Sequence, residues 1–518
     1  MKLWQDLLGT DVVGSYVDGE VIPGGGDEME LVNPSTEVTY TAYRDSGPEV
    51  VHRAVEAAHR AGGQWRALTA SAQGRILWAV GQAVRANVEE LARLEAQTVG
   101  KPLKDAIGET VKVAEMFEYY AGWADKQHGE VIPVPTSHLT YTLREPYGVV
   151  AQMTPWNAPI FTAGWQLAPA LAAGNTVVLK PSELTPLTSV LLARLAENAG
   201  LPQGSVNVIA GLGPTAGQAL VTHSGIGKVV FVGSPTTGRR IAAAAGERLI
   251  PCVLELGGKS ANIVFEDADL SRAVGGAAAA IFSGTGQSCV AGSRLLIQSS
   301  VYDEVLERMG DLAARIRQGN PFDQETQVGP VQNAAQLTRI TSMVDAAVDG
   351  SAHVVVGGAR VDRPGFFFPP TILSGVTNEH PIARDEIFGP VVVAIPFEDE
   401  AEAVRLANDS SFGLAGAVWT SAVDRAHRVA GQIRAGTVWV NSYKTINVMA
   451  PFGGFGASGS GRSSGYDGLL DYTQPKTVWV ETNPDAPLAI GYCDVNWGLL
   501  KVWMLLLISS GVLLGLLI

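Results

Sequence analysis

The stretch NTVVLKPS, residues 175–182, carries a clear signal of the fold of this chain. It is a short apolar run that ends in lysine, proline and serine, which is typical of a buried strand followed by a turn. The segment LTSVLLARLAENAG (187–200) that follows has a helical pattern. A buried strand followed by a helix is the repeating unit of a parallel α/β sheet, in which helices cover the faces of the sheet.

The same alternation continues along the chain in two series. The first series adds the runs SVNVIAG (205–211), GKVVFVGS (227–234) and CVLELGG (252–258), with a predicted helix in TAGQALVTHSG (215–225). The second series holds SANIVFED (260–267), SRLLIQSSVYDEVLERMGDLAARI (293–316), HVVVGG (353–358), PVVVAIPFED (390–399) and GTVWVNSY (436–443). Upstream, residues 48–127 have the spacing of amphipathic helices, and residues 138–156 alternate like strands. Two series predict two α/β lobes with a cleft between them.

Length and composition narrow the class of protein. At 518 residues the chain is too long for one compact core, so two or three domains are expected. A net charge of −14 without a basic run argues against a nucleic-acid partner. The cysteines Cys252, Cys289 and Cys493 are too few and too far apart for a disulfide scaffold or a clustered zinc site, and we predict no metal site. With no signal-peptide pattern at the N-terminus, a cytoplasmic, reducing setting is expected.

The end of the chain has a different composition. Residues 502–518 carry no charge, and as a helix these 17 residues span about 25 Å, slightly less than a roughly 30 Å hydrocarbon core. Adding residues 498–500, with the amine of Lys501 reaching toward the interface, supplies enough length. Residues 498–518 therefore predict a C-terminal membrane anchor. The alternatives are a tail buried against a neighbouring subunit and a sequence that is not native to the protein.

Three polar residues stand in patterns that fit either chemistry or structure. Cys289, in GTGQSCVAGSR (284–294), is surrounded by small residues and fits a nucleophile or a small buried hydrophobe. Glu255 lies inside an apolar strand pattern, where burial raises the pKa of a carboxyl group toward that of a general base, unless a salt bridge explains it. Asn157, between two prolines, fits an oxyanion donor or a turn residue.

Three glycine-rich or polar turns are candidates for binding a phosphate or a ribose. In FVGSPTTG (231–238) a helix that starts at the turn would direct free backbone N–H groups at a pyrophosphate, although an ordinary turn fits as well. KPSE (180–183) suits ribose hydroxyls or a solvated turn. GLGPTAG (211–217) begins like the dinucleotide fingerprint, but its third glycine comes one position late.

Taken together, seven motifs resemble the aldehyde dehydrogenase superfamily, and they occur in its characteristic order. They are TPWNAPI (154–160), LKPSE (179–183), FVGSPTTG (231–238), LELGGKS (254–260), GQSCVAGSR (286–294), EIFGPV (386–391) and PFGGFGASGSGR (451–462). The resemblance covers about residues 10–484 and implies an NAD(P)-dependent oxidation of an aldehyde to a carboxylic acid.

The resemblance implies a role for each catalytic candidate. Cys289 corresponds to the nucleophile, Glu255 to the general base, and Asn157 to the oxyanion donor that acts with the backbone N–H of Cys289. The thiolate would form a thiohemiacetal, hydride transfer to the nicotinamide would leave a thioester, and water activated by Glu255 would release the acid. Holding the adduct close to the nicotinamide is the main requirement.

The resemblance also implies the cofactor contacts. Lys180 and Glu183 correspond to residues on the adenosine ribose, Gly233 and Ser234 to the pyrophosphate turn, and Gly213 to a loop near the adenine. The other implied contacts are Glu386 on the nicotinamide ribose, Phe388 beside the nicotinamide, and Thr154, Trp156, Ser182 and Leu256. A glutamate at 183 favours NAD over NADP, because it accepts the 2′-hydroxyl and repels a 2′-phosphate.

The implied architecture has a Rossmann-like cofactor domain, an α/β catalytic domain and a small β domain that bridges the subunits of a homodimer or homotetramer. The expected boundaries are 1–127, 147–255 and 447–470 for the cofactor domain, 256–446 for the catalytic domain, 128–146 and 471–484 for the bridging strands, and 485–518 for the tail.

Two other functions and two departures from the family pattern stay open at this point. A CoA-acylating semialdehyde dehydrogenase usually lacks the general base, so Glu255 argues against it. A non-catalytic, membrane-attached relative is expected to have lost catalytic residues.

Gly456 stands at the usual lysine and Ser463 at the usual glutamate, which we expect to affect local and subunit contacts and not the chemistry. An anchored enzyme would favour a hydrophobic aldehyde.

Overall fold

A computed structural model of the protein describes residues 4–5 and 9–486. Packing divides these residues into a large unit, up to Gln127 and from Pro146 to Gln474, and a small unit, His128–Glu145 and from Pro475 onward. Within the described ranges, no helix is long and apolar enough to cross a membrane. The predicted anchor at 498–518 lies outside these ranges, so it stays a prediction.

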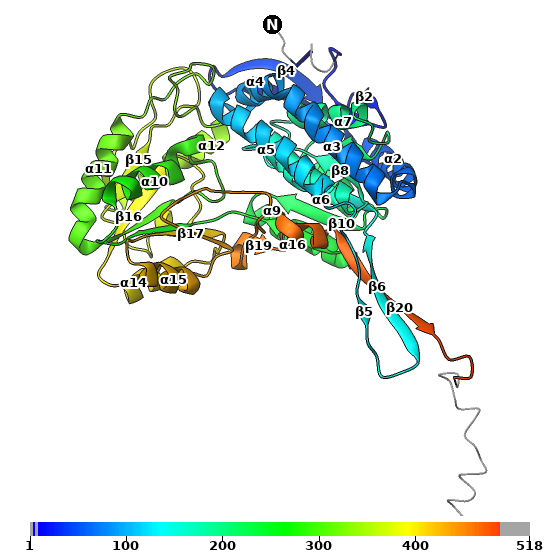
Figure 1. The fold of residues 1–518 in the computed structure, drawn as a ribbon. Helices are drawn as coiled ribbons and strands as arrows, with labels where there is room; N and C mark the ends of the chain where they lie inside the picture. The colour runs from blue at the N-terminus through cyan, green and yellow to red at the C-terminus, as the bar shows by residue number, and fades with distance from the viewer. Residues whose placement is uncertain (1–3, 6–8, 487–518) are drawn as a thin grey trace, which may run out of the picture. The chain divides into compact units, whose positions relative to one another are not determined.

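The first sheet of the large unit has eight strands in the order β19-β11-β10-β7-β8-β9-β1-β2, of which Figure 1 labels β19, β10, β8 and β2. Its parallel core consists of β7 (Val149–Met153), β8 (Thr176–Lys180), β9 (Val206–Val208), β10 (Lys228–Val232) and β11 (Cys252–Glu255). The edges are antiparallel and consist of β1 (Ser15–Val17), β2 (Glu20–Ile22) and β19 (Gly459–Ser460). The run at 175–182 is therefore a buried strand, as predicted.

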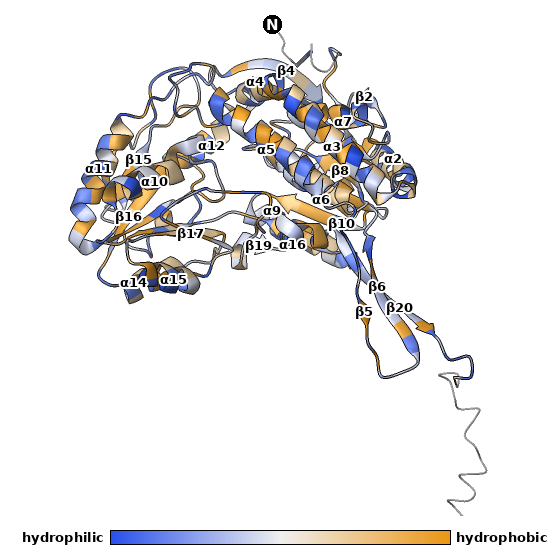
Figure 2. Ribbon diagram, in the orientation of Figure 1, coloured by the Kyte–Doolittle hydropathy of each residue, from blue (hydrophilic) through white to orange (hydrophobic). Residues whose placement is uncertain are grey.

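Helices cover both faces of this sheet. Val150 of β7 packs in an apolar cluster with helices of one face, and its neighbour Val149 packs with helices of the other. The first face carries α3 (Ala70–Ala86), α4 (Val88–Val99), α5 (Leu103–Ala121), α6 (Pro159–Ala172) and α7 (Leu187–Asn198). The second carries α2 (Gly47–Ala67), α8 (Gln218–Thr222) and α9 (Pro235–Glu247). In Figure 2 the sheet strand labelled β10 is largely hydrophobic, whereas the outer helices carry hydrophilic stretches.

A second sheet in the same unit has seven strands in the order β14-β15-β16-β13-β12-β17-β18, parallel except for the β14–β15 pair. Its strands are β12 (Ala261–Val264), β13 (Arg294–Gln298), β14 (His353–Val356), β15 (Thr371–Ser374), β16 (Val391–Phe397), β17 (Ala415–Trp419) and β18 (Thr437–Val440). One face packs against α10 (Leu270–Phe282) and α11 (Tyr302–Ala314). The other packs against α12 (Ala334–Asp349), α13 (Pro381–Arg384), α14 (Glu400–Asn408) and α15 (Val423–Gln432). The two predicted α/β series thus form two covered sheets.

Two smaller sheets complete the described structure. A hairpin pairs β3 (Glu28–Asn33) with β4 (Val38–Arg44), and a three-stranded sheet has the order β20-β6-β5, with β5 (Val131–Ile132), β6 (His138–Pro146) and β20 (Thr473–Glu481). Short helical turns are η1 (Gly213–Gly217), η2 (Ser283–Gly286), η3 (Ser299–Val301), η4 (Gly456–Ser458) and α16 (Gly465–Asp471). The predicted α/β class is confirmed, while the exact domain boundaries stay a prediction.

The sequence patterns missed some elements and overstated one. The strands β15 and β17 lie inside the second sheet, but β15 follows two prolines and β17 begins with Ala-Gly-Ala, residues with a low preference for strands. The predicted helix at 215–225 is α-helical only over Gln218–Thr222. The π-turn η1 precedes it, where two glycines and Pro214 disfavour a regular α-helix.

Candidate active site

The carboxyl ends of four parallel strands place four predicted residues along one edge of the first sheet. In sheet order, Glu255 ends β11, Gly233 follows β10, Thr154 follows β7 and Lys180 ends β8. Neighbouring strands lie about 4.8 Å apart, so this edge measures about 14 Å. Ligands of open parallel sheets bind at such an edge, and this length suits an elongated dinucleotide.

Lys180 and Glu183 lie together at the end of β8. The buried Nζ of Lys180 donates to the carbonyl oxygen of Pro181 at 3.0 Å and lies 3.8 Å from Oε2 of Glu183. Burial lowers the pKa of Lys180, and the Glu183 carboxylate partly offsets that effect. The Ser182 hydroxyl accepts from the Leu184 N–H at 3.3 Å, which fixes the turn. The carboxylate of Glu183 remains partly exposed and open to a ribose hydroxyl.

The turn η1 lies beside this ribose candidate. A Cβ added to Gly217 would lie 3.4 Å from Cδ of Lys180, whereas one added to Gly213 would meet no atom within 4 Å. Gly213 therefore borders open space close to Lys180. This position fits the adenosine end of a dinucleotide better than the phosphate role that the glycine spacing alone indicates.

A helix starts at the turn after β10, as the motif FVGSPTTG predicts. Ser234 is the N-cap of α9, and its hydroxyl accepts from the Thr237 N–H at 3.3 Å. A Cβ added to Gly238 would lie 2.6 Å from a methyl carbon of Leu256, so the absence of a side chain lets the helix pack against the segment after Glu255. The helix N-terminus carries a partial positive charge and unpaired N–H groups, which suit a pyrophosphate.

Cys289 lies in a loop held by a run of unusual backbone. Gly284, Thr285 and Gly286 precede it with φ of 66°, 59° and 67°. A Cβ on Gly286 would lie 1.9 Å from the carbonyl oxygen of Gly389, so only glycine fits there. The thiol is half-buried, and burial raises its pKa to about 12, with the carboxylates of Glu255 and Glu386 adding to the effect. Both carboxylates therefore lie close enough to affect the sulfur.

The segment after β11 brings the thiol and the carboxylates together. The Gly258 N–H donates to Oε1 of Glu386 at 2.9 Å, and a Cβ on Gly258 would lie 2.5 Å from the carbonyl oxygen of Cys289. A Cβ on Gly257 would lie 2.2 Å from Oε2 of Glu386. Two glycines in succession are thus required, because the segment passes between the nucleophile loop and the Glu386 carboxylate.

Glu255 is buried, with 5% of its surface exposed, and its two carboxylate oxygens differ. Oε1 accepts a hydrogen bond from the Ser463 hydroxyl at 2.8 Å, whereas Oε2 has no hydrogen-bond partner in the structure. Burial raises the pKa of Glu255 to about 8, and the Ser463 hydrogen bond is the first of the influences that lower it. A carboxyl group with this pKa and one free oxygen suits a general base near neutral pH.

Asn157 lies in the loop between β7 and α6, next to the nucleophile loop. Its Nδ2 donates to the carbonyl oxygen of Gln287 at 2.8 Å, two residues before Cys289. One N–H of this amide remains for an oxyanion near the sulfur.

Two of the implied cofactor contacts meet each other. The rings of Trp156 and Phe388 pack edge to face, with centroids 5.3 Å apart and planes at 88°. Phe388 has a φ of +59°, which is rare for an aromatic residue. The half-buried Glu386, two residues earlier, has its pKa raised to about 7 by burial. Glu386, Phe388 and Trp156 therefore lie near the end of the first sheet's edge that is closer to the sulfur of Cys289.

Ser463 corrects one expectation from the sequence. We expected the departure at 463 to affect local and subunit contacts only, but its hydroxyl bonds directly to the predicted general base. Lys444, which no motif singled out, follows Tyr443, which packs against the same apolar cluster as Cys289, and its charge acts to lower the pKa of that thiol. The sequence marks Ser463 because it stands where the family usually has glutamate. No sequence pattern marks Lys444.

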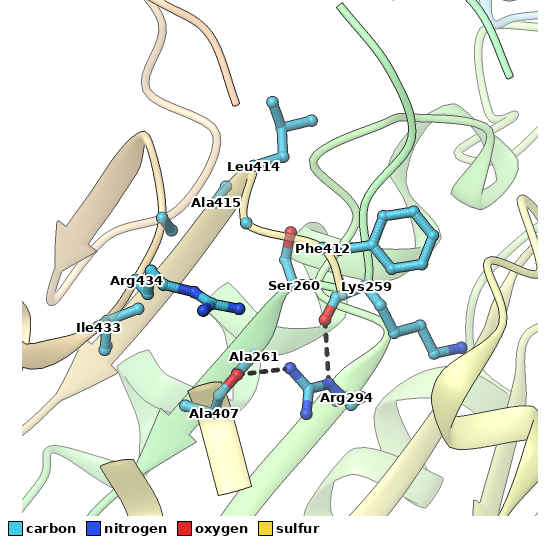
Figure 3. A pocket seen from close by; sticks show the side chains of 12 residues that line it. Lys259, Ser260, Ala261, Arg294, Ala407, Phe412, Leu414, Ala415, Ile433 and Arg434 are labelled. Atoms are coloured by element: carbon cyan, nitrogen blue, oxygen red, sulfur yellow. Dashed lines mark hydrogen bonds between the residues drawn. The ribbon is translucent and has the colours of Figure 1, made fainter. Parts of the chain in front are cut away.

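Figure 3 shows a pocket beside the LELGGKS segment, lined among others by Lys259, Ser260 and Arg294. The guanidinium of Arg294 makes four hydrogen bonds, to three backbone carbonyl oxygens and to Oδ1 of Asn378, with N···O distances of 2.7 to 2.9 Å. The Lys259 side chain extends away from this guanidinium (Figure 3). None of the predicted site residues lines the pocket, and we assign it no part in the site.

Comparisons with known proteins agree on one family. The model of the aldehyde dehydrogenase family matches residues 21–478. The chain is 40% identical to betaine aldehyde dehydrogenase of Bacillus subtilis over 491 residues, which is 93% of this chain and 98% of the relative. It is 42% identical to human retinal dehydrogenase 2 over 461 residues, which is 88% of this chain and 89% of the relative.

The fold agrees equally closely with a solved structure. The NAD+ complex of aldehyde dehydrogenase from Bacillus cereus superposes with a TM-score of 0.90 at 39% sequence identity. The match covers 92% of this chain and 98% of that one.

Proposed function

This chain belongs to the aldehyde dehydrogenase family, and from that premise we propose which of its residues carry out the reaction. The protein oxidises an aldehyde to a carboxylic acid with NAD as the cofactor. One observation carries the assignment of residues. The Gly257–Gly258 step contacts both the backbone of Cys289 and the carboxylate of Glu386, directly after Glu255. A nucleophile, a base and a cofactor ligand thus surround one point.

The catalytic residues act in two stages. The Cys289 thiol first gives up its proton to solvent, and the Sγ thiolate forms a bond to the aldehyde carbon. The oxyanion of the resulting thiohemiacetal is held by the free N–H of Asn157 and the backbone N–H of Cys289. Bound NAD supplies the hydride acceptor that converts this adduct to a thioester. Oε2 of Glu255 then takes a proton from water, and the hydroxide attacks the thioester carbon. The S–C bond breaks, the acid leaves, and Cys289 is restored.

The strand edge fits the cofactor. Glu386 accepts a hydrogen bond from Gly258 and is ready to bind a ribose hydroxyl. Thr154 has a buried hydroxyl with no hydrogen-bond partner in the structure, at the centre of the edge. At the other end, the partly exposed Glu183 favours NAD, because it accepts the 2′-hydroxyl and repels a 2′-phosphate. NADP remains the alternative cofactor.

Lys444 indicates the charge of the substrate. It follows β18 in a loop whose residues Tyr443, Ile446 and Phe452 pack against the same apolar cluster as Cys289. Its Nζ donates to the carbonyl and hydroxyl oxygens of Ser283 at 3.2 and 3.1 Å.

The charge of Lys444 lacks a close partner of opposite sign. Asp105 and Glu109 of α5 are near enough to raise its pKa, but none of the ion pairs among the described residues includes Lys444. Burial lowers its pKa to about 8, and Cys289 is the first of the groups that offset this. An ammonium group of this kind beside the sulfur favours an aldehyde that carries a carboxylate and disfavours a cationic one.

An assay with two aldehydes of equal length and different charge tests the reaction and this preference. Initial rates of NADH formation are measured with succinic semialdehyde and with butanal, which has the same chain length without the carboxylate. We expect Lys444→Met to lower kcat/KM for the semialdehyde about 10- to 100-fold, the size of a charged hydrogen bond, and to leave butanal within about 2-fold.

Lys104→Met, at an exposed lysine of α5, serves as the control and should leave kcat/KM unchanged for both aldehydes. An equal loss on both aldehydes would mean that Lys444 acts on the thiol and not on the substrate. No NADH from any aldehyde would contradict the assigned reaction itself.

The three-stranded sheet is the expected contact between subunits. Within the small unit Val131 is 72% exposed and Trp479 is 56% exposed, which is costly for a strand edge left in water. Burial of these side chains against a second copy would form a homodimer or homotetramer.

Sedimentation velocity tests the assembly. The double variant Val131→Glu with Trp479→Glu is expected to sediment as a smaller species than the unaltered protein, because charge opposes apolar association. Val423→Glu is the matched control, since Val423 of α15 is also 72% exposed. Unchanged sedimentation of the double variant would place the subunit contact elsewhere.

The location of the protein in the cell stays a prediction. A cytoplasmic setting stays an expectation, and a membrane anchor follows only from residues 498–518, outside the described residues. A hydrophobic aldehyde delivered from a membrane depends on that anchor alone.

A further inference from the structure

A buried chain of uncharged side chains leads to the predicted general base. It consists of Gln152, Tyr472, Gln166 and Ser463, each no more than 1% exposed, and it ends at Glu255. The N···O and O···O distances along it are 3.2, 2.6, 3.2 and 2.8 Å in that order. The residues come from β7, from the end of α16, from α6 and from the segment after β19, so the chain joins four elements behind the carboxylate.

The first bond fixes the direction of the whole chain. Nε2 of Gln152 also donates to the backbone carbonyl oxygen of Gln166 at 2.8 Å, and a carbonyl oxygen can only accept. The amide of Gln152 must therefore present its NH2 group to this region, and its second N–H is given to the Tyr472 oxygen. Burial raises the pKa of Tyr472 far above its usual value, so its hydroxyl stays protonated.

The remaining bonds follow from this orientation. Tyr472, which accepts from Gln152, gives its own proton to Oε1 of Gln166. The Gln166 amide is thereby oriented with Nε2 toward Ser463, and it donates to the hydroxyl oxygen of that serine. The Ser463 hydroxyl is left with one proton to donate, and it donates to Oε1 of Glu255. Every donor in the chain points toward the carboxylate.

We infer that Ser463 is a positioning residue that reserves Oε1 of Glu255 as an acceptor and leaves Oε2 as the only oxygen that exchanges protons with water. This inference rests on the role of Glu255 proposed above. A proton taken up by Glu255 cannot pass along this row of hydrogen bonds. Each donor and acceptor would have to exchange roles as far as the backbone carbonyl oxygen of Gln166, which can only accept. The proton therefore leaves from Oε2, on the same side as the water it came from.

The pH profile of ester hydrolysis tests this role without the cofactor. Hydrolysis of p-nitrophenyl acetate proceeds through an acyl group on Cys289, and the water that releases it needs ionised Glu255. Ser463→Ala removes a hydrogen bond to the charged form, so the pKa of Glu255 rises. The midpoint of the acid limb should move from about pH 8 to about pH 9, with about a 10-fold loss at pH 7 and little loss at pH 10.

Three further variants separate positioning from general damage to the fold. Ser463→Thr keeps the hydroxyl and should restore the midpoint to about pH 8. Ser464→Ala removes an equally buried neighbouring hydroxyl, which bonds only to the carbonyl of Ala450, and should leave the profile unchanged. Gln166→Leu frees Ser463 to rotate and should shift the limb in the same direction. Its effect should add nothing to that of Ser463→Ala, because both act through one bond.

The outcomes distinguish this inference from the proposed function. If Glu255→Gln abolishes turnover but Ser463→Ala leaves the midpoint unchanged, Glu255 is the base and the positioning role of Ser463 is wrong. The role is also wrong if Ser463→Ala and Ser463→Thr lose activity equally at every pH. If Glu255→Gln retains full hydrolysis, the proposed base itself is wrong.

Discussion

Replacing Cys289 with alanine removes aldehyde oxidation, with a fall in kcat of about 10⁴-fold or more, because the residue supplies the bond-forming atom of both intermediates. Without the sulfur neither the thiohemiacetal nor the thioester can form. NADH formation and ester hydrolysis are therefore lost together. Both rates are measured on the same preparation, with circular dichroism to show that the variant is folded.

Cys252→Ala is the matched control for this substitution. Cys252 is also half-buried, lies three residues before Glu255 in β11, and has its pKa raised to about 11 by burial. It resembles Cys289 in burial and in thiol pKa, but it opens β11, about 10 Å along the strand from Glu255 at the other end. Its alanine variant should keep nearly full activity. Oxidation that persists in Cys289→Ala, or is lost in Cys252→Ala, contradicts the assignment of the nucleophile.

The fold could be predicted from the sequence because its signal is local. Alternating apolar runs and helical segments are visible within windows of about ten residues, and they predict covered parallel sheets without knowledge of which strands pair. The same pattern ends a strand at Lys180, and the carboxylate of Glu255 is a costly charge inside an apolar strand pattern, so both residues are candidates from the sequence alone. The strand order decided that these residues share one edge.

The inner contacts of the site could not be predicted from local patterns. Ser463 meets Glu255 across 208 positions of sequence, and Gly258 meets the backbone of Cys289 through a close approach that only the fold reveals. Lys444 lies in an irregular loop with a φ of +56°, where no periodicity marks its direction. Such contacts depend on packing between distant segments, so a departure from a family motif shows that something differs there but not what it touches.

Replacing Glu255 with glutamine should stop the reaction after the first product. Glutamine keeps the size of the side chain and still accepts from Ser463, but it cannot take a proton from water. We expect a burst of about one NADH per active site followed by turnover about 10²- to 10⁴-fold slower, because the thioester accumulates on Cys289. Rapid-mixing absorbance measures the burst, and mass spectrometry of the quenched enzyme measures the acyl group.

The raised pKa of Glu255 sets the direction in which turnover changes with pH. Burial raises the pKa of Glu255 to about 8, and the base is active only when ionised, so turnover limited by hydrolysis should rise with pH and reach half of its plateau at about pH 8. In Glu255→Gln this limb should vanish, and the remaining slow hydrolysis should follow only the hydroxide concentration. A variant that shows no burst would mean that Glu255 is also needed to deprotonate Cys289, whose own pKa is raised to about 12. A variant with an unchanged limb and full turnover would mean that another group activates the water.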